Sequence, residues 1–238
     1  MLKSTNSTSP PQAQAQFNAR VIIFDLDGTL VHSGPDLADA INRMLVELDM
    51  PLYADQTIFK WLGNGVEMLV ERAITGGAGA EVEPELLARG YKMFTTFYRD
   101  RLCVRSVLYP LVEPVLDQLK TRGFKLACLT NKAETFTIPL LHTLRLYRYF
   151  DLVIAGDSLS TKKPDPRPIY HILREFDIPG EASVMVGDSV SDIQAAQAAG
   201  IPVICVSFGY NQGMDLTRAH PDAIIDSFAQ LPELFEYV

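Results

Sequence analysis

The feature that most constrains this chain is a short apolar run followed by two carboxylates. Val21-Ile22-Ile23-Phe24 is continuous and mostly β-branched, and Asp25 and Asp27 come directly after it. Such a run is typical of a strand buried on both faces of a parallel sheet. In α/β proteins, ligands bind beyond the carboxyl ends of these strands. The sequence therefore places two carboxylates where chemistry is expected.

Similar apolar runs recur along the chain and alternate with helical patterns. We predict further strands at residues 124–129, 152–155, 183–186 and 202–206. Between and beside them, helical spacing of apolar residues predicts helices at residues 112–121, 135–144, 168–176 and 192–199. Alternating strands and helices predict an α/β fold, with a doubly wound, mostly parallel and Rossmann-like sheet.

One segment interrupts this alternation with helices alone. Helical patterns cover residues 36–48, 66–74 and 84–102, and no strand pattern lies between them. We therefore expect an all-helical cap at residues 35–104, inserted into a catalytic core of residues 19–34 and 105–238. Residues 1–18, rich in Ser, Pro, Gln and Ala, are expected to form a flexible tail. Hinges are expected near residues 33–34 and 105–109, where the chain crosses between core and cap.

The charge balance argues against some classes of partner. The chain has 29 acidic and 21 basic residues, a net charge of -8 and no Lys/Arg block, so we expect neither nucleic acid nor a membrane as partner. No apolar run is long enough to span a bilayer, and the first residues lack a signal-peptide pattern. The three cysteines show neither zinc-site spacing nor a disulfide framework. These features predict a cytoplasmic protein, and they leave a small anionic substrate possible if a metal or a few placed side chains supply positive charge locally.

Two carboxylates around a glycine also occur in turns and at the start of EF-hand loops. In this chain Asp36, not Glu, stands at the twelfth position of such a loop, and a buried parallel strand is the wrong context. Three further patterns follow this one in order along the chain. The four patterns are Asp25-x-Asp27-Gly28-Thr29, Thr130 after a predicted strand, Lys163 before Pro164, and Gly187-Asp188 with Asp192 after another strand. Together they resemble the four signatures of the haloacid dehalogenase superfamily, over nearly the whole chain beyond the tail.

The resemblance implies a Mg²⁺-dependent phosphatase in which Asp25 is the nucleophile and is transiently phosphorylated. Asp27 would act as general acid and base. Asp25, Asp188 and the backbone carbonyl of Asp27 would hold Mg²⁺, and Asp192 would face the ion from farther away. The chemistry agrees with this, because a carboxylate that attacks a dianionic phosphate ester needs a hard cation to cancel the repulsion.

The remaining expected site residues contact the substrate. Thr130 would donate its hydroxyl to a phosphoryl oxygen, while Lys163 would neutralise another oxygen and hold Asp25 as a carboxylate. Gly28 and Asn131 are expected beside the same phosphoryl group. Arg72 is the candidate for the part of the substrate that the cap recognises.

Within the superfamily, several segments resemble bacterial phosphoglycolate phosphatases: residues 30–37, 61–66, 71–73 and 129–132. This implies hydrolysis of 2-phosphoglycolate to glycolate. Leu111 departs from the pattern, which has Gly after Tyr109-Pro110. The alternatives are a related phosphatase or phosphomutase that acts on a sugar phosphate, an amino-sugar phosphate or pyrophosphate. A non-enzymatic binding protein on the same scaffold is a further alternative, although it would be expected to have lost one of the key aspartates.

Overall fold

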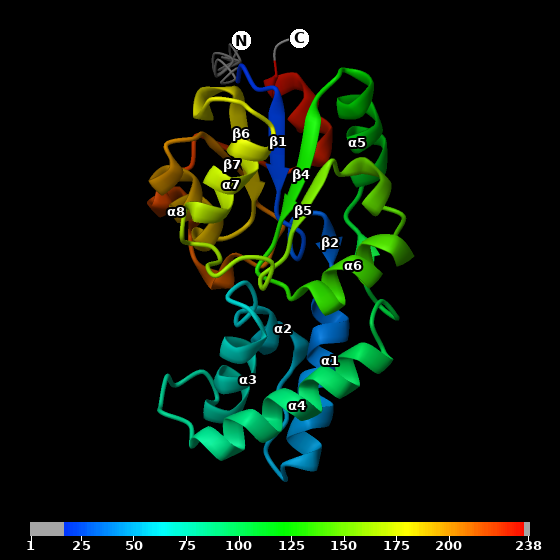
Figure 1. Cartoon of the computed structure of the whole chain (residues 1–238). Coiled ribbons are helices and arrows are strands. Elements are labelled where there is room, and N and C mark those ends of the chain that lie inside the picture. The colour runs from blue at the N-terminus through cyan, green and yellow to red at the C-terminus, as the bar shows by residue number, and fades with distance from the viewer. Residues whose placement is uncertain (1–16, 236–238) are drawn as a thin grey trace, which may run out of the picture.

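A single parallel sheet organises the chain around β1. The computed structural model describes residues 17–235, and the strands of this sheet run in the order β5-β4-β1-β6-β7-β8 (Figure 1). Their bounds are Val21–Phe24 (β1), Lys125–Leu129 (β4), Leu152–Ile154 (β5), Ser183–Gly187 (β6), Val203–Val206 (β7) and Ala223–Ile225 (β8). The chain adds β4 and β5 on one side of β1 and the other strands on the opposite side, which makes the carboxyl end of β1 the switch point. The predicted doubly wound α/β fold is confirmed.

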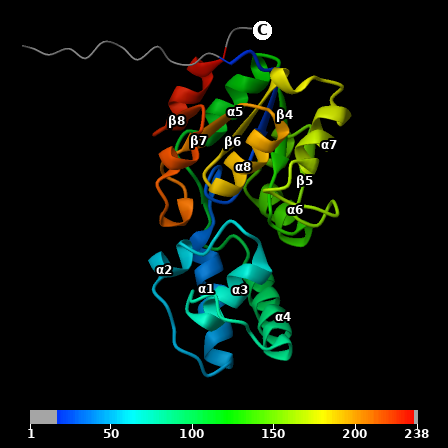
Figure 2. The ribbon, with the colours of Figure 1, turned by 90° about the vertical axis from the view of Figure 1, so that its left-hand side faces the viewer.

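Helices cover both faces of this sheet because its central strands are apolar on both sides. Ile22 and Phe24 of β1 face one buried cluster, and Val21 and Ile23 face the other. Figure 2 shows α8 on the near face of the sheet and α5 behind it. The helices beside the sheet are Val112–Thr121 (α5), Glu134–Thr143 (α6), Arg167–Glu175 (α7) and Val190–Ala199 (α8). Short 3-10 helices span Tyr147–Tyr149, Gly180–Ala182, Asn211–Gly213, Leu216–Ala219 and Phe228–Leu234.

The expected all-helical segment lies beyond the carboxyl edge of the sheet (Figure 1). It contains Gly34–Glu47 (α1), Asp55–Phe59 (α2), Val66–Thr75 (α3) and Pro84–Asp100 (α4). Here α1 packs along α4 and also contacts α2 and α3. Ile41, Met44, Phe94 and Tyr98 are fully buried in a cluster of this segment, which one residue of α6, Phe136, also joins. The helices are as predicted, apart from the short α2, and the division into domains at residues 35 and 104 stays a prediction.

Two short strands bring the ends of the helical segment together. Val31–His32 (β2) pairs antiparallel with Val107–Leu108 (β3). Beside this pair, the buried carboxylate of Asp36 accepts hydrogen bonds from the backbone N–H of Arg105 at 2.8 and 3.0 Å. It also accepts bonds from the N–H and the hydroxyl of Ser106, at 2.8 and 2.6 Å. The outgoing and returning connections are therefore clamped to each other by one side chain.

Replacing Asp36 by Ala is expected to lower the free energy of unfolding by about 2–4 kcal/mol. The substitution leaves the N–H and the hydroxyl of the buried Ser106, and the part-buried N–H of Arg105, without their acceptor. Each unsatisfied buried group costs about 1–3 kcal/mol. Urea unfolding would measure the loss. Asp55→Ala is the control, since its contact with Arg105 is exposed and long, at 3.4 Å. Equal stability of the Asp36 variant and the control would contradict the clamp.

The structure corrects the predicted end of the tail, and it shows the backbone conformation at Leu111, where the sequence departs from the expected Gly. Phe17, which the prediction placed in the tail, is buried, and it pairs with Phe235 while its N–H donates to the Leu234 carbonyl at 2.7 Å. The rest of the predicted tail, except Asn18, lies outside the described residues. Leu111 has a left-handed backbone, with φ of 66°, at the start of α5. Only glycine adopts this conformation without strain, so the departure from the expected Gly carries a local cost.

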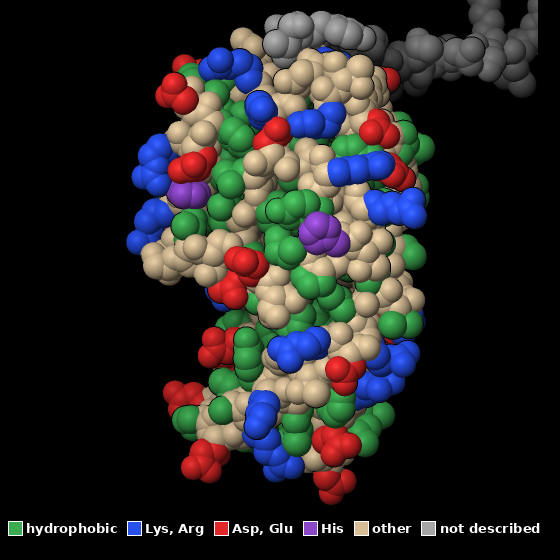
Figure 3. All heavy atoms as spheres, turned by 45° about the vertical axis from the view of Figure 1, so that its right-hand side comes forward, with side chains coloured by type: hydrophobic (Ala, Val, Ile, Leu, Met, Phe, Trp, Pro, Cys, Tyr) green, Lys and Arg blue, Asp and Glu red, His purple; other side chains and the backbone are tan. Residues whose placement is uncertain are grey.

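Charged side chains of both signs share the visible surface. On the face in Figure 3, Lys and Arg side chains are interspersed with Asp and Glu. Of the helices within residues 17–235, none combines the length and the apolar character needed to cross a bilayer.

Candidate active site

The predicted site residues come from loops that follow neighbouring strands. Asp25 and Asp27 follow β1, Thr130 follows β4, and Asp188 follows β6, on the other side of β1. Lys163 lies in the loop between β5 and α7. Parallel strands direct their carboxyl ends to one edge of the sheet, which gathers side chains that lie far apart in the sequence.

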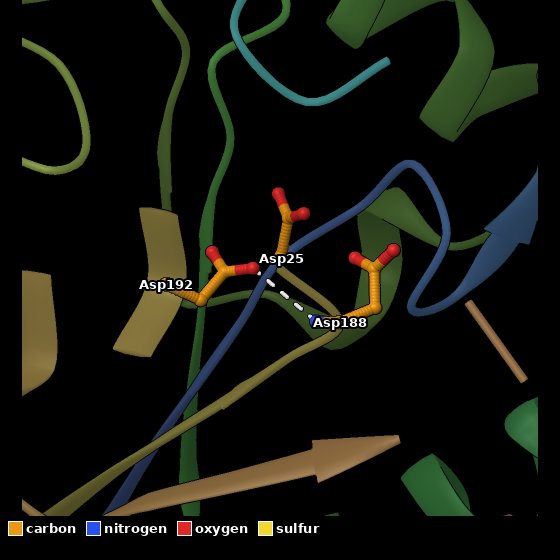
Figure 4. Close-up of side chains that lie close together, drawn as sticks. All are labelled: Asp25, Asp188 and Asp192. Carbon is orange, nitrogen blue, oxygen red and sulfur yellow. Dashed lines mark hydrogen bonds between the residues drawn. The ribbon is translucent and has the colours of Figure 1, made fainter. Parts of the chain in front are cut away.

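Three buried carboxylates meet at the carboxyl end of β1. One oxygen from each of Asp25, Asp188 and Asp192 lies within 4.8 Å of the others. Figure 4 shows the carboxyl groups of Asp25 and Asp188 pointing to the same side, while Asp192 bonds back to the Asp188 backbone. All three are at most 7% exposed. The structure thus brings together the residues that the sequence suggested for a metal site.

Lys163 supplies the positive charge beside these carboxylates. Its ammonium lies 2.7 Å from Asp25 Oδ1 and 2.7 Å from Asp192 Oδ1, and it donates to the Leu129 carbonyl at 2.7 Å. An ammonium has three N–H groups, so these contacts use all of them. Burial alone would lower the pKa of Lys163, but the carboxylates of Asp192 and Asp25 raise it above its ordinary value. Lys163 is therefore a fixed cation that orients Asp25.

The pKa of Asp25 reflects a shortage of positive charge. This pKa is raised to about 7: burial is the largest cause, Lys163 opposes the rise, and the neighbouring Asp192 adds to it. Burial, together with Asp25 and Asp192, also raises the pKa of Asp188 well above its usual range. One ammonium does not balance three carboxylates in a region that excludes water. Hard oxygen donors with an excess of buried negative charge fit a divalent cation.

The position of Asp188 is set by a glycine and two hydrogen bonds. Thr29 donates its hydroxyl to Asp188 Oδ1 at 3.0 Å, and the N–H of Tyr210 donates to Oδ2 at 2.7 Å. Gly28 has a φ of 93°, and a Cβ there would lie 2.1 Å from Asp188 Oδ2. A glycine is required at position 28 on both grounds. Sequence reasoning placed Gly28 beside the substrate, and the structure shows that it also makes room for Asp188.

Asp192 holds the loop that carries Asp188. Its Oδ2 accepts bonds from the N–H of Asp188 at 3.2 Å, and from the N–H and hydroxyl of Ser189 at 3.0 and 2.7 Å. Together with Ser189 it forms a capping box at the start of α8. Since Lys163 contacts Oδ1, the carboxylate of Asp192 is oriented toward its own loop and Lys163.

Asp27 is held by groups that the sequence analysis did not assign. Ser33 donates its hydroxyl to Asp27 Oδ1 at 2.5 Å. The ammonium of Lys132 lies 3.0 Å from Oδ2 and 3.3 Å from Oδ1, and it donates to the hydroxyl of Tyr98, on α4, at 2.7 Å. Lys132 stands two residues after Thr130, so its position after a strand was a signal that could have identified it. No sequence signal identified Tyr98, because it lies 34 positions before Lys132 and on a different predicted element.

A cavity of about 40 Å³ separates these carboxylates from the helical segment. It is lined by Asp25, Asp27, Leu37, Leu62, Gly63, Gly65, Val66, Leu69, Thr130, Asn131 and Lys132. The side-chain amide of Asn131 donates to the carbonyls of Gly63 and Lys163, at 3.0 Å each. It therefore links the helical segment to the loop that carries Lys163. Thr130 is buried beside it and accepts a bond from the N–H of Lys132 at 3.2 Å.

Arg72 is a predicted site residue that neither lines this cavity nor contacts the buried carboxylates. Its guanidinium donates to the carbonyl of Trp61 at 2.7 Å, within the helical segment. It is not among the described residues that line the cavity. Its expected contact with the substrate is therefore without support from the geometry.

Comparison with known proteins agrees with this arrangement. The family model described as haloacid dehalogenase-like hydrolase matches residues 22–206. A phosphoglycolate phosphatase of Nitrosospira multiformis is 44% identical over 217 residues, which cover 91% of this chain and 96% of the relative. A phosphoglycolate phosphatase of Nitrosococcus oceani is 42% identical over 214 residues, covering 90% and 95%.

Solved structures show the same fold. A crystal structure from Haemophilus somnus, described as a predicted phosphoglycolate phosphatase, superposes with a TM-score of 0.87 at 35% identity. The match covers 91% of this chain and 98% of that one. CbbY from Rhodobacter sphaeroides, solved in complex with phosphate, has a TM-score of 0.75 at 25% identity, with 90% and 96% of the two chains covered.

Proposed function

We propose that this chain, which belongs to the haloacid dehalogenase-like hydrolases, hydrolyses a small phosphate monoester, with 2-phosphoglycolate as its preferred substrate. The observation that carries the proposal is the position of Asp25, between the fixed cation Lys163 and the carboxylate of Asp188, with Asp27 two residues farther on. The two phosphoglycolate phosphatases compared above, which match at least 90% of this chain, support the choice of substrate. Glycolate and inorganic phosphate are the products.

Asp25 and Asp27 divide the chemistry between them. A carboxylate oxygen of Asp25 forms a bond to phosphorus as the bond from phosphorus to the ester oxygen breaks, which yields an aspartyl phosphate. Asp27 gives a proton to the departing alcohol oxygen, and then takes one from the water that attacks the aspartyl phosphate. Lys163 favours the ionised form of Asp25 and orients its carboxylate toward the phosphoryl group. Ser33 and Lys132 hold Asp27 in place.

The cation of this site is, in our proposal, Mg²⁺. Asp25, Asp188 and the backbone carbonyl of Asp27 would hold it, while Asp192 orients the Asp188 loop. When bound, Mg²⁺ would cancel negative charge on the phosphoryl oxygens and on the carboxylate that attacks them. Beside it, the Thr130 hydroxyl donates to a phosphoryl oxygen, and Gly28 and Asn131 line the place of the same group.

The helical segment acts as a cap in this proposal, with residues 35–104 closing over the carboxyl edge of the sheet. A cavity of about 40 Å³ has room for only a few water-sized atoms, since one water needs about 10–15 Å³. Such a space favours a small leaving alcohol, and closure of the cap over it would exclude bulk water from the aspartyl phosphate. We further propose a cytoplasmic enzyme, monomeric or homodimeric, that acts on a small phosphorylated metabolite.

A panel of phosphate esters tests the proposed function. The purified chain is assayed for phosphate release from 2-phosphoglycolate, sugar phosphates, an amino-sugar phosphate and pyrophosphate, with Mg²⁺ and with EDTA. The highest kcat/KM is expected for 2-phosphoglycolate with Mg²⁺. A higher kcat/KM for another ester would identify that ester as the preferred substrate instead. Recovery of an isomerised sugar phosphate would identify a phosphomutase.

Asp27→Ala is expected to slow alkyl esters more than aryl esters. An alkoxide leaving group needs a proton from Asp27, whereas a phenoxide with a low pKa departs with little help. We expect kcat to fall about 10²–10⁴-fold on 2-phosphoglycolate, and about tenfold less than that on p-nitrophenyl phosphate. Steady-state kinetics on both esters measure the difference. Equal losses would show that Asp27 has only a structural role.

A further inference from the structure

One buried cation lines the cavity without a direct part in the reaction described above. The side chain of Lys132 is 3% exposed, and it is the only Lys or Arg among the described residues that line the cavity. Arg72, which the sequence suggested for this purpose, donates to the Trp61 carbonyl instead. Positive charge at the place of the leaving alcohol therefore comes from the sheet side of the cavity.

The ammonium of Lys132 is fixed from two sides. It donates to the hydroxyl of Tyr98 at 2.7 Å and lies 4.6 Å from the centre of that ring. On the other side it contacts both oxygens of Asp27, at 3.0 and 3.3 Å. One N–H can serve both oxygens of a carboxylate, and Tyr98 takes a second one. The third N–H is then available to a ligand in the cavity.

The side chains that the described helical segment contributes to the lining of the cavity offer no partner for an anion. Leu37, Leu62, Val66 and Leu69 line the side of the cavity formed by the helical segment, and they are apolar. A negative charge placed against them without a partner would be costly. Asp27 would repel such a charge, whereas Lys132 lies beside Asp27 and balances it.

We propose that Lys132 determines substrate specificity, and that its ammonium binds a carboxylate on the leaving alcohol of the substrate. This inference rests on the phosphatase function proposed above. With phosphorus at Asp25 and the ester oxygen at Asp27, a carboxylate one carbon beyond that oxygen lies next to the group that contacts Asp27. Tyr98 positions the ammonium, so a residue of α4 contributes to specificity without touching the substrate.

Two substrates that differ in one charge test the inference. In 2-hydroxyethyl phosphate, a neutral CH₂OH replaces the carboxylate of 2-phosphoglycolate, and the rest of the molecule is the same. For Lys132→Met, we expect the ratio of kcat/KM for phosphoglycolate to kcat/KM for hydroxyethyl phosphate to fall about 30-fold or more. Lys132→Arg should recover part of the ratio, because it keeps the charge. Tyr98→Phe keeps the ring but removes the 2.7 Å contact, so it should lower the ratio by a smaller factor.

The ratio separates recognition from a merely structural role. A displaced Asp27 would slow both substrates equally and leave the ratio unchanged, which would overturn the assignment of Lys132. The control is Lys92→Met, an exposed lysine on the same helix as Tyr98, which should leave the ratio at the wild-type value. A fall of the ratio in Arg72→Met rather than in Lys132→Met would also overturn the assignment. If the wild type itself does not prefer phosphoglycolate, the proposed substrate fails, and the role of Lys132 in binding it fails for that separate reason.

Discussion

Asp25→Asn is expected to lower kcat by ~10⁴-fold or more on every phosphate ester that the wild type hydrolyses. An amide is a poor nucleophile and a weaker ligand for a hard cation, so both the covalent step and the metal site are affected. The fold should remain, because Asn has the same shape and removes one of three crowded carboxylates. Phosphate release in the steady state, with circular dichroism as a check on the fold, measures the effect.

A matched variant identifies the cause of this loss. Asp226→Asn changes an exposed carboxylate that bonds to Ser207, follows the edge strand β8 and lies outside the carboxylate cluster, and it should keep wild-type activity. After a brief reaction stopped with acid, the denatured wild-type enzyme is expected to carry covalently bound phosphate, and the Asp25 variant is expected to carry none. Turnover by Asp25→Asn at more than a few per cent of the wild-type rate would remove Asp25 from the mechanism.

Removal of the metal ion is expected to abolish turnover and to make stability depend strongly on pH. The pKa of Asp25 is raised to about 7, first by burial and then by Asp192, and the pKa of Asp188 is also raised. A carboxyl group with a higher pKa in the folded state binds its proton more tightly there than in the unfolded chain. Its contribution to stability is therefore complete below about pH 4 and is lost as the pH rises through about 7. The metal-free protein should thus lose stability across this range.

Mg²⁺ should offset this loss where the carboxylates are ionised. Binding to the folded state alone stabilises it by about 2.7 kcal/mol at a hundredfold excess over Kd. We expect Mg²⁺ to raise Tm by several degrees at about pH 8 and by much less at about pH 5, where protons compete for the same oxygens. Thermal unfolding with EDTA and with Mg²⁺ at both values measures this.

The dependence on Asp188 distinguishes this site from general effects of salt. Asp188→Asn should remove most of the Mg²⁺-induced rise in Tm, because it takes away a charged ligand. Asp226→Asn should keep the rise, since that residue lies outside the cluster. A rise of equal size in all three proteins, or hydrolysis that continues unchanged in EDTA, would contradict a metal ion at Asp25 and Asp188.

The sequence by itself determined five strands of the six-stranded sheet (all but β8), most of the helices and the carboxylates at the edge of the sheet. The run at Val21–Phe24 and the helix at Val112–Thr121 are local patterns, and α5 has the bounds that its apolar spacing predicted. Side chains directly after parallel strands meet at one edge whatever the details of packing. Asp25, Thr130 and Asp188 could therefore be placed in one site from their positions alone.

The tertiary structure alone decided which residues surround the leaving alcohol. Arg72 stands on a predicted helix, but only the packing of that helix directs its guanidinium to the Trp61 carbonyl. Lys132 contacts Asp27, 105 positions earlier, because β1 and β4 are neighbouring strands. It contacts Tyr98, 34 positions earlier, because α4 lies against the end of β4. The pairing of β2 with β3 involves two residues on each side, too few to show an alternating pattern. Local periodicity reports how a segment folds, whereas these contacts depend on which distant segments pack side by side, and this is why the structure was needed to find them.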